Sequence, residues 1–146
     1  MNARPILFGT PGPPRTLDAG LLVLRVGLFA MLALGHGLGK LPVAQGFIDN
    51  TAGLGFPLPA LFAWAAALSE FAGGLLLALG LMTRPAAAFV AFTMLVAFAL
   101  QHGFALTGEG SGELAFLYLV GAVALLLTGP GRFSVDAQLA RPAVRY

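Results

Sequence analysis

The sequence predicts an all-α integral membrane protein, a bundle of four transmembrane helices, and two observations indicate this fold. Hydrophobic residues make up 58% of the 146 residues and charged residues only 10%, whereas a soluble domain carries about 25% charged residues. So few charges cannot cover a surface that faces water. The apolar residues also fall in four continuous runs, as spanning helices of about 20 residues require, and they do not alternate as in the strands of a membrane barrel.

The four runs place the helices at residues 19–40, 60–82, 85–103 and 113–128. Together they form one domain over residues 17–136, since a chain of this length is enough for one compact unit. Residues 41–59 contain repeated Pro and Gly and predict a loop with a short interfacial turn. Pro85 suits the first position of the third helix, and Gly129-Pro130-Gly131 ends the fourth.

Both termini are expected to be cytoplasmic tails. Residues 1–16 contain four prolines and lack the apolar core of a cleavable signal, so we expect a flexible tail there. A second tail is expected at residues 137–146. With four spans, the tails and the turn before Pro85 share one side of the membrane, and an excess of arginine marks that side as cytoplasmic. Its arginines are Arg4, Arg15, Arg84, Arg132, Arg141 and Arg145, against Lys40 on the other side.

Polar residues inside the expected helices are the candidates for function, because a charge within the bilayer costs about 2.5–3.5 kcal/mol on insertion scales. Arg25 and His36 lie about 20° apart on the first helix, and Lys40 lies about 60° from Arg25, so the three form one stripe that faces the bundle interior. At about 1.5 Å per residue, Glu70 lies near mid-membrane, and His36 and His102 lie slightly further out. The full set is Arg25, His36, Lys40, Glu70, Gln101, His102 and Glu113.

These residues predict an outward-opening ligand pocket among the first three helices. We expect its polar lining to be His36, Glu70 and His102, with Arg25 below and Lys40 at the rim, and we expect Arg25 to pair with Glu70 directly or through water. The apolar walls are expected from Phe29, Leu32 and Phe98. Simpler interpretations stay open: Arg25 can extend to the cytoplasmic interface, Lys40 can be an interfacial anchor, and the other polar residues can serve helix packing alone. No catalytic residue is assigned.

The sequence argues against several kinds of cofactor and partner. The absence of cysteine excludes thiolate-bound cofactors, and no covalently attached cofactor is expected. His36, His102 and Glu70 lack the spacing of a metal site, so no metal is expected. No phosphate-binding loop or dinucleotide fingerprint is present. The basic residues are explained by membrane orientation, so nucleic acid is not an expected partner.

Several segments are similar to those of a known membrane protein family. The first helix reads LRVGLFAMLALGHGLGKL over residues 24–41, and residues 53–87 read GLGFPLPALFAWAAALSEFAGGLLLALGLMTRPAA. His102-Gly103 ends the third helix, and GPGRFSVD closes the bundle at residues 129–136. With these motifs, residues 17–136 resemble the DoxX family of small four-helix bacterial membrane proteins, which is related to the DoxD proteins.

The resemblance implies a multi-pass protein of the bacterial cytoplasmic (inner) membrane, acting as a subunit of a quinone-linked oxidoreductase system. Its implied cofactor is a quinone, and its implied partners are the lipid bilayer, redox subunits or further copies of the chain. Because the sequence supplies no redox centre of its own, a bound quinone or a partner subunit would carry the electrons. The alternative is a non-enzymatic membrane scaffold or small-molecule carrier, in which the intramembrane polar residues fix helix packing.

Overall fold

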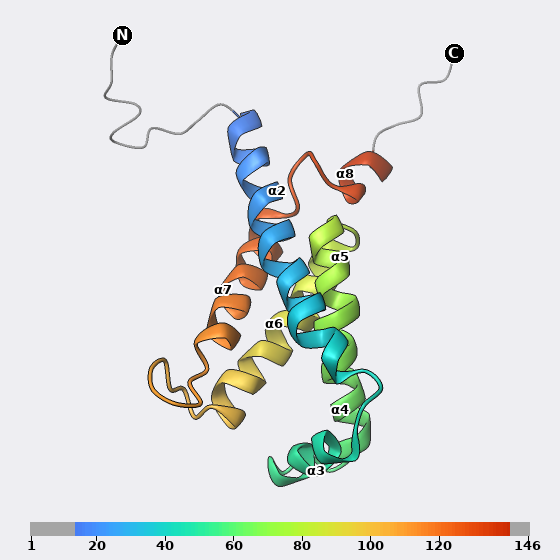
Figure 1. Cartoon of the computed structure of the whole chain (residues 1–146). Helices are drawn as coiled ribbons and strands as arrows, with labels where there is room; N and C mark the ends of the chain where they lie inside the picture. The colour runs from blue at the N-terminus through green and yellow to red at the C-terminus, as the bar shows by residue number, and fades with distance from the viewer. Residues whose placement is uncertain (1–13, 141–146) are drawn as a thin grey trace.

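The protein is described by a computed structural model over residues 14–140, which form helices joined by turns and contain no strand (Figure 1). The first long helix comprises α2 (Pro14–Met31), η1 (Leu32–Gly37) and η2 (Leu38–Lys40). The second comprises α4 (Pro59–Leu68), η3 (Ser69–Gly73) and α5 (Gly74–Leu79). The third comprises α6 (Thr83–Val96) and η4 (Ala97–Gln101), and the fourth is α7 (Glu113–Thr128). Two short helices complete the described part of the chain, α3 (Gln45–Gly53) and α8 (Val135–Leu139).

The prediction of an all-α protein with four apolar helices is confirmed. Residues 15–40, 59–79 and 83–101 are long and apolar enough to cross a membrane by length and composition, and α7 is apolar but shorter. The loop before the second helix holds the nine-residue helix α3 where only a short turn was expected. Residues 14–16 of the expected first tail are already helical, and residues 1–13 lie outside the described residues. The second tail overlaps α8, and residues 141–146 likewise lie outside the described residues.

Proline and glycine set the ends of the long helices. Pro59 occupies the first turn of α4, where its missing N–H has no intrahelical acceptor to lose. Gly80 ends α5 in the left-handed conformation, with φ of 67°, which a residue with a Cβ rarely adopts. These local signals explain why the helix boundaries were close to those expected from the sequence.

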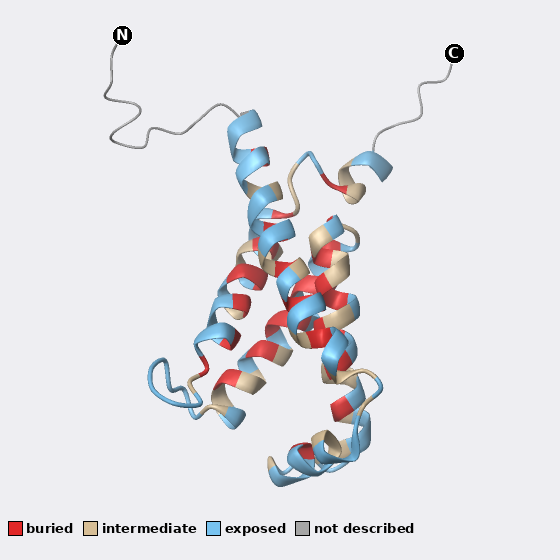
Figure 2. Cartoon of the chain, in the orientation of Figure 1, coloured by how far each residue is buried: buried red, intermediate tan, exposed pale blue. Residues whose placement is uncertain are grey.

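The core lies inside the bundle, where buried positions from all four long helices face one another (Figure 2). The fully buried apolar side chains include Phe29, Leu32, Leu77, Val90 and Leu125. Small residues bring the first two helices together: a Cβ on Gly74 would lie 3.0 Å from the Cβ of Ala33. A Cβ on Gly37 would lie 2.6 Å from the Cα of Phe71, so the two backbones are nearly in contact there.

Three of the long helices contain a π-helical turn. These turns are η1 in the first helix, η3 in the second and η4 in the third. A π turn bonds i to i+5 and is found mostly as a short insertion, frequently at functional sites. Nothing in the apolar pattern predicts these turns, and each one rotates the residues beyond it away from the 100° phase of an α-helix.

The bundle has two distinct ends. The terminal end is where α2 begins and α8 lies, and the α3 end is opposite (Figure 1). The π turns η1 and η4 lie in the parts of their helices toward the α3 end, and η3 lies midway along the second helix. The described ends of the chain thus lie on one side, and the assignment of that side to the cytoplasm stays a prediction.

Candidate functional site

A partly buried ion pair lies at the centre of the candidate site. The Nζ of Lys40 lies 2.5 Å from both carboxylate oxygens of Glu70. The Glu70 side chain is only 5% exposed, whereas that of Lys40 is 34% exposed. Lys40 also lies 5.3 Å from the ring centroid of Phe47 on α3. The pair therefore joins the outer part of the first helix to η3, and the ring of Phe47 covers the lysine.

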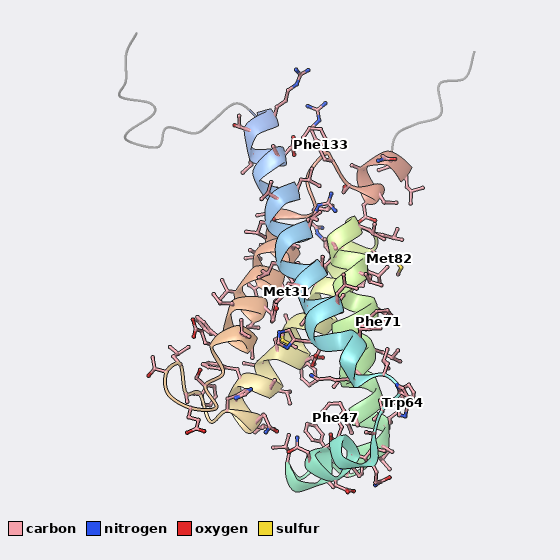
Figure 3. The ribbon with its side chains drawn as sticks, viewed as in Figure 1. Met31, Phe47, Trp64, Phe71, Met82 and Phe133 are labelled. Carbon is pink, nitrogen blue, oxygen red and sulfur yellow. The ribbon has the colours of Figure 1, made fainter. Side chains whose placement is uncertain are left out.

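The expected pairing of Arg25 with Glu70 is wrong. Arg25 is 1% exposed, and it donates from Nη1 to the carbonyl of Ala78 at 2.8 Å and from Nη2 to the carbonyl of Phe133. Phe133 lies toward the terminal end and Phe47 at the α3 end (Figure 3). Carbonyl acceptors close to its own depth bind the two terminal nitrogens of Arg25, and its buried Nε has no partner among the described residues. Lys40, which was expected only at the rim or the interface, follows the π turn η1 and pairs with Glu70.

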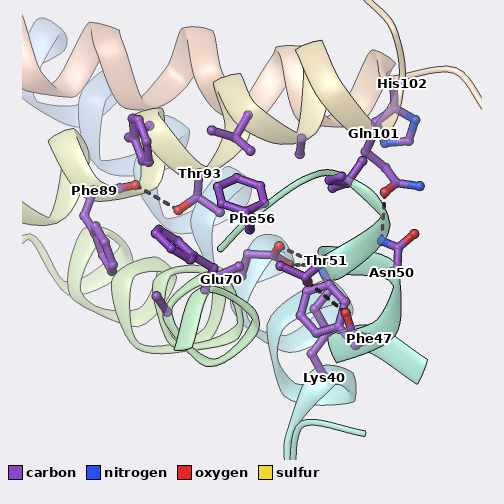
Figure 4. A pocket seen from close by; sticks show the side chains of 17 residues that line it. Lys40, Phe47, Asn50, Thr51, Phe56, Glu70, Phe89, Thr93, Gln101 and His102 are labelled. Atoms are coloured by element: carbon purple, nitrogen blue, oxygen red, sulfur yellow. Dashed lines mark hydrogen bonds and ion pairs between the residues drawn. The ribbon is translucent and has the colours of Figure 1, made fainter. Parts of the chain in front are cut away.

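The first cavity has a volume of about 370 Å³ and lies between α3, the second helix and the third helix (Figure 4). Ten of its seventeen lining residues are apolar, and five of these are phenylalanines, Phe47, Phe56, Phe62, Phe89 and Phe92. Its polar lining comprises Lys40, Asn50, Thr51, Glu70, Thr93, Gln101 and His102. The cavity is thus an aromatic-walled space with the Lys40–Glu70 pair in its wall.

A second cavity, of about 230 Å³, borders the same ion pair and lies among the first, third and fourth helices. It shares Lys40, Glu70, Ala97 and His102 with the first cavity. Its own polar residues are His36, Ser111 and Tyr118, so six of its eleven lining residues are polar. Glu70 therefore borders an apolar space and a more polar one.

Hydrogen bonds orient several of the lining groups. Asn50 on α3 donates to the side-chain carbonyl of Gln101 at 2.8 Å, which ties α3 to the third helix. Nδ1 of His102 donates to the carbonyl of Gly110 at 2.8 Å, so in the neutral ring Nε2 is the acceptor nitrogen. The ring of His36 packs edge-on against Tyr118, with 5.7 Å between centroids.

The structure brings together most, but not all, of the residues expected at one pocket. Lys40, Glu70 and His102 line both cavities, and His36 lines the second, whereas Arg25 lines neither. The expected apolar walls are misplaced. Phe29 and Phe98 are core residues that line neither cavity, and Leu32 borders only the second. The first cavity is walled instead by phenylalanines of α3, α4 and α6 and of the loop between α3 and α4, because the rings that face it are set by helix packing.

Sequence reasoning missed the contribution of α3. Asn50, Thr51 and Phe47 line the first cavity from this helix. The segment had been assigned to a loop because of its flanking Pro and Gly, and nine residues are too few for a clear periodic signal. Gln101 was among the intramembrane polar residues, but the sequence offered no partner for it.

The polar groups at the terminal end form a separate cluster that lines neither cavity. Asp136 accepts hydrogen bonds from the N–H groups of Met82 and Thr83, at 2.8 and 2.9 Å, and from the Thr83 hydroxyl at 2.7 Å. Burial raises the pKa of Asp136, but these donors and the charge of Arg25 outweigh burial and lower the pKa below its ordinary value. Asp136 therefore caps the start of α6 in its ionised form.

Comparison with known proteins identifies the family. The DoxX family model matches residues 20–103. The chain belongs to the DoxX family. It is 36% identical to the Escherichia coli protein "Inner membrane protein YqjF" over 84% of this chain and 93% of the relative. It is 32% identical to "Inner membrane protein YphA" of the same organism, over 80% of this chain and 87% of the relative.

A third relative bears a name that refers to redox chemistry. The chain is 30% identical to the Bacillus subtilis protein "Putative oxidoreductase CatD", over 84% of this chain and 88% of the relative. No solved structure matches the chain. The family and the apolar helices together identify this DoxX protein as a multi-pass protein of the bacterial inner membrane. Among the described residues, no group of three or more His, Asp or Glu side chains is placed to hold a metal ion.

Proposed function

We propose that this DoxX protein is the quinone-binding membrane subunit of an oxidoreductase system, and that the first cavity binds the quinone head group. The observation that supports this proposal is the Lys40–Glu70 pair in the wall of an aromatic cavity. Ligand cavities generally measure about 300–1,000 Å³ and combine apolar walls with a few polar groups. The volume of about 370 Å³ lies within that range.

The residues present fit a quinone head group chemically. The ammonium of Lys40 can donate a hydrogen bond to one carbonyl oxygen, and the amide of Asn50 or Gln101 can donate to another. Phenylalanine rings suit a planar conjugated ring by offset or edge contacts. Three of the phenylalanines, Phe47, Phe56 and Phe62, line the same cavity as Lys40.

The second cavity supports the same proposal as a route for protons. A quinone, when bound, accepts two electrons and two protons. Glu70 borders both cavities, so its carboxylate can exchange protons between the head group and the more polar second cavity. His36, His102 and Tyr118 line that cavity, and imidazole exchanges protons readily near neutral pH. The electron donor is proposed to be a partner subunit, since the sequence has no cysteine to bind a redox cluster.

The name of the CatD relative supports the redox class but no particular reaction. The alternative is a non-enzymatic scaffold or small-molecule carrier. One observation favours it: the Lys40–Glu70 pair lies where Gly37 brings the first two helices almost into backbone contact. The same pair could therefore serve packing alone.

Binding of a quinone analogue to the purified protein in lipid nanodiscs tests the proposal, with the shift in melting temperature as the readout. The Lys40→Met variant should bind at least about tenfold more weakly. Glu113→Gln is the matched control, because Glu113 is exposed and lines neither cavity. Binding that is unchanged in folded Lys40→Met and His102→Ala, or absent from the parent in every lipid, would favour the scaffold.

The orientation in the membrane is also a proposal, with both termini in the cytoplasm and α3 at the outer face. It is supported by the arginine excess near the terminal end. Reporter fusions at Arg145 and within residues 104–112 test it. A cytoplasmic signal from the 104–112 loop would reverse the orientation and place both cavities toward the cytoplasm.

A further inference from the structure

We propose that the first cavity is reached sideways from the bilayer, through an opening between α4 and α6, and that its floor holds the apolar chain of a membrane-dissolved quinone. This inference rests on the proposed function and adds to it the class of ligand and its path. It makes the ligand a long-chain quinone from the lipid phase and excludes a small water-soluble molecule that enters from outside.

The shape of the cavity is the first argument. Its lining residues on the third helix run from Phe89 to Gln101, and Phe89 and His102 mark its two ends along that helix (Figure 4). Twelve helical residues correspond to about 18 Å, which is more than half of a hydrocarbon core of about 30 Å. A head group alone does not need a cavity of this length, whereas a head group with a chain does.

The second argument is the exposure of the residues at the deep end. Phe89 and Phe92 line the cavity, yet they are 47% and 57% exposed. Both lie within a helix long and apolar enough to span the membrane, so their exposed faces border lipid. On the opposite wall α4 contributes the small side chains of Ala65 and Ala66, which leave space between the two helices.

The third argument is that α3 closes the other end. Phe47, Asn50, Thr51 and Leu54 of α3 line the cavity, and the bond from Asn50 to Gln101 fastens this helix to the third helix. Thr51 is buried and bonds the carbonyl of Phe47 within α3. α3 therefore lies across this end of the cavity, with Asn50 and Gln101 exposed at its edge, whereas the exposed rings of Phe89 and Phe92 border lipid at the other end.

The polarity of the walls orients the occupant. The donors that can bind a head group come from Lys40 and from the α3 end, at Asn50 and Gln101. Toward Phe89 the polar lining groups are Thr93 and Glu70, and both already have partners. The Thr93 hydroxyl is bonded to the Ser69 hydroxyl at 2.9 Å and to the Phe89 carbonyl at 3.1 Å, and Glu70 is paired with Lys40. The head therefore lies beneath α3, and the chain lies along Phe89 and Phe92.

A bulkier side chain in the part of the first cavity between α4 and α6, here called the groove, tests the proposal. Two ligands are compared in nanodiscs, a benzoquinone head group with a decyl chain and the same head group without a chain. Ala66→Leu should weaken binding of the chain-bearing ligand by about tenfold and leave the chain-free ligand within about twofold. Ala72→Leu is the matched control, because Ala72 lies on the same long helix, is exposed and lines neither cavity.

A second pair of variants keeps the test decisive if the added bulk unfolds the protein. Phe92→Ala removes a wall of the groove, and Leu95→Ala removes an exposed side chain of the same helix that lines neither cavity. Selective loss of the chain-bearing ligand in Phe92→Ala alone supports the groove. Equal affinity of the parent for both ligands, or an equal loss of both in Ala66→Leu, overturns the groove and leaves the proposed function standing.

Two further outcomes separate the remaining explanations. If the parent binds neither ligand, the proposed function fails, and this inference fails with it. If phospholipid with brominated chains lowers the affinity for the chain-bearing ligand as strongly as excess unlabelled quinone does, the groove is a general lipid site, and the assignment to quinone is overturned. If the brominated phospholipid leaves the affinity for the chain-bearing ligand unchanged, the assignment to quinone is supported.

Discussion

The two ends of the bundle use charged residues in opposite ways. At the terminal end, Arg25 donates to two backbone carbonyls, and Asp136 accepts three hydrogen bonds at the start of α6. Neither residue lines the first or the second cavity. At the α3 end, Lys40 and Glu70 bond to each other and line both cavities. Charged residues thus form hydrogen bonds that hold segments together at the terminal end, and they line the two cavities at the α3 end.

This difference teaches how to distinguish structural from functional charges in a membrane bundle. An intramembrane charge is a candidate for function by default. Arg25 met that criterion from the sequence, yet its donors serve the end of the second helix and the segment after the fourth. The distinguishing property is the space beside the charge, which depends on packing and not on residue type.

The largest effect that would break the comparison is expected from Arg25→Met. Two hydrogen bonds from a charged group are lost, each worth about 1.5–3 kcal/mol, so we expect a loss of unfolding free energy of about 3 kcal/mol or more. The affinity for a quinone analogue should be unchanged in the folded fraction. Denaturation in detergent measures the first quantity, and Arg84→Met, at an exposed arginine, is the control. A loss of ligand affinity would join Arg25 to the cavity end.

The Lys40–Glu70 pair should show a smaller and coupled effect. Lys40→Met alone leaves a buried carboxylate without its partner, whereas the double variant with Glu70→Gln removes both charges. We expect the double variant to be more stable than the sum of the single variants by about 1–2 kcal/mol. A double-mutant cycle on detergent stability measures this coupling. Additive single effects would contradict the pairing in the structure.

Two glycines with positive φ compare the crowding at the two ends. Gly80 has φ of 67°, and an added Cβ would lie 2.5 Å from Nη1 of Arg25 and 2.6 Å from the Cβ of Ser134. Gly103 has φ of 57°, and an added Cβ would meet nothing within 4 Å. Left-handed backbone costs about 1–2 kcal/mol for a residue with a Cβ. Gly103→Ala should lower the free energy of unfolding by about that amount, and Gly80→Ala should lower it more. Equal melting temperatures of the two variants would show that the residues around Gly80 move to accommodate the added Cβ.

The smallest expected effect concerns the pH dependence of the terminal end. The pKa of Asp136 is lowered in the folded protein, so its carboxylate stabilises the fold above the ordinary aspartate pKa of about 4. That contribution is lost as pH falls through the lowered folded pKa. The stability difference between the parent and Asp136→Asn should therefore narrow in acid. A constant difference between neutral pH and pH of about 3 would show that ionisation of Asp136 contributes nothing.

The fold class, the four helices and the family could all be predicted from the amino-acid sequence. These properties depend on local composition, because any apolar run of sufficient length must satisfy its backbone within a helix in lipid. Glycine and proline then set the helix ends, as at Pro59 and Gly80. The sequence also selected Glu70 and His102 as intramembrane polar residues, and both line the cavities.

The pairing of the charged residues and the positions of the cavities could not be predicted from the sequence. Phase arithmetic at 100° per residue placed Arg25, His36 and Lys40 on one stripe, but the π turn η1 lies between Arg25 and Lys40 and changes that phase. Lys40 therefore reaches Glu70, and Arg25 finds carbonyls contributed by residues 53 and 108 positions away. The position of α3 across the end of the first cavity likewise involves a long-range contact, the hydrogen bond from Asn50 to Gln101, 51 positions apart. Such contacts are fixed by how helices pack against one another, which no local pattern of apolar residues records.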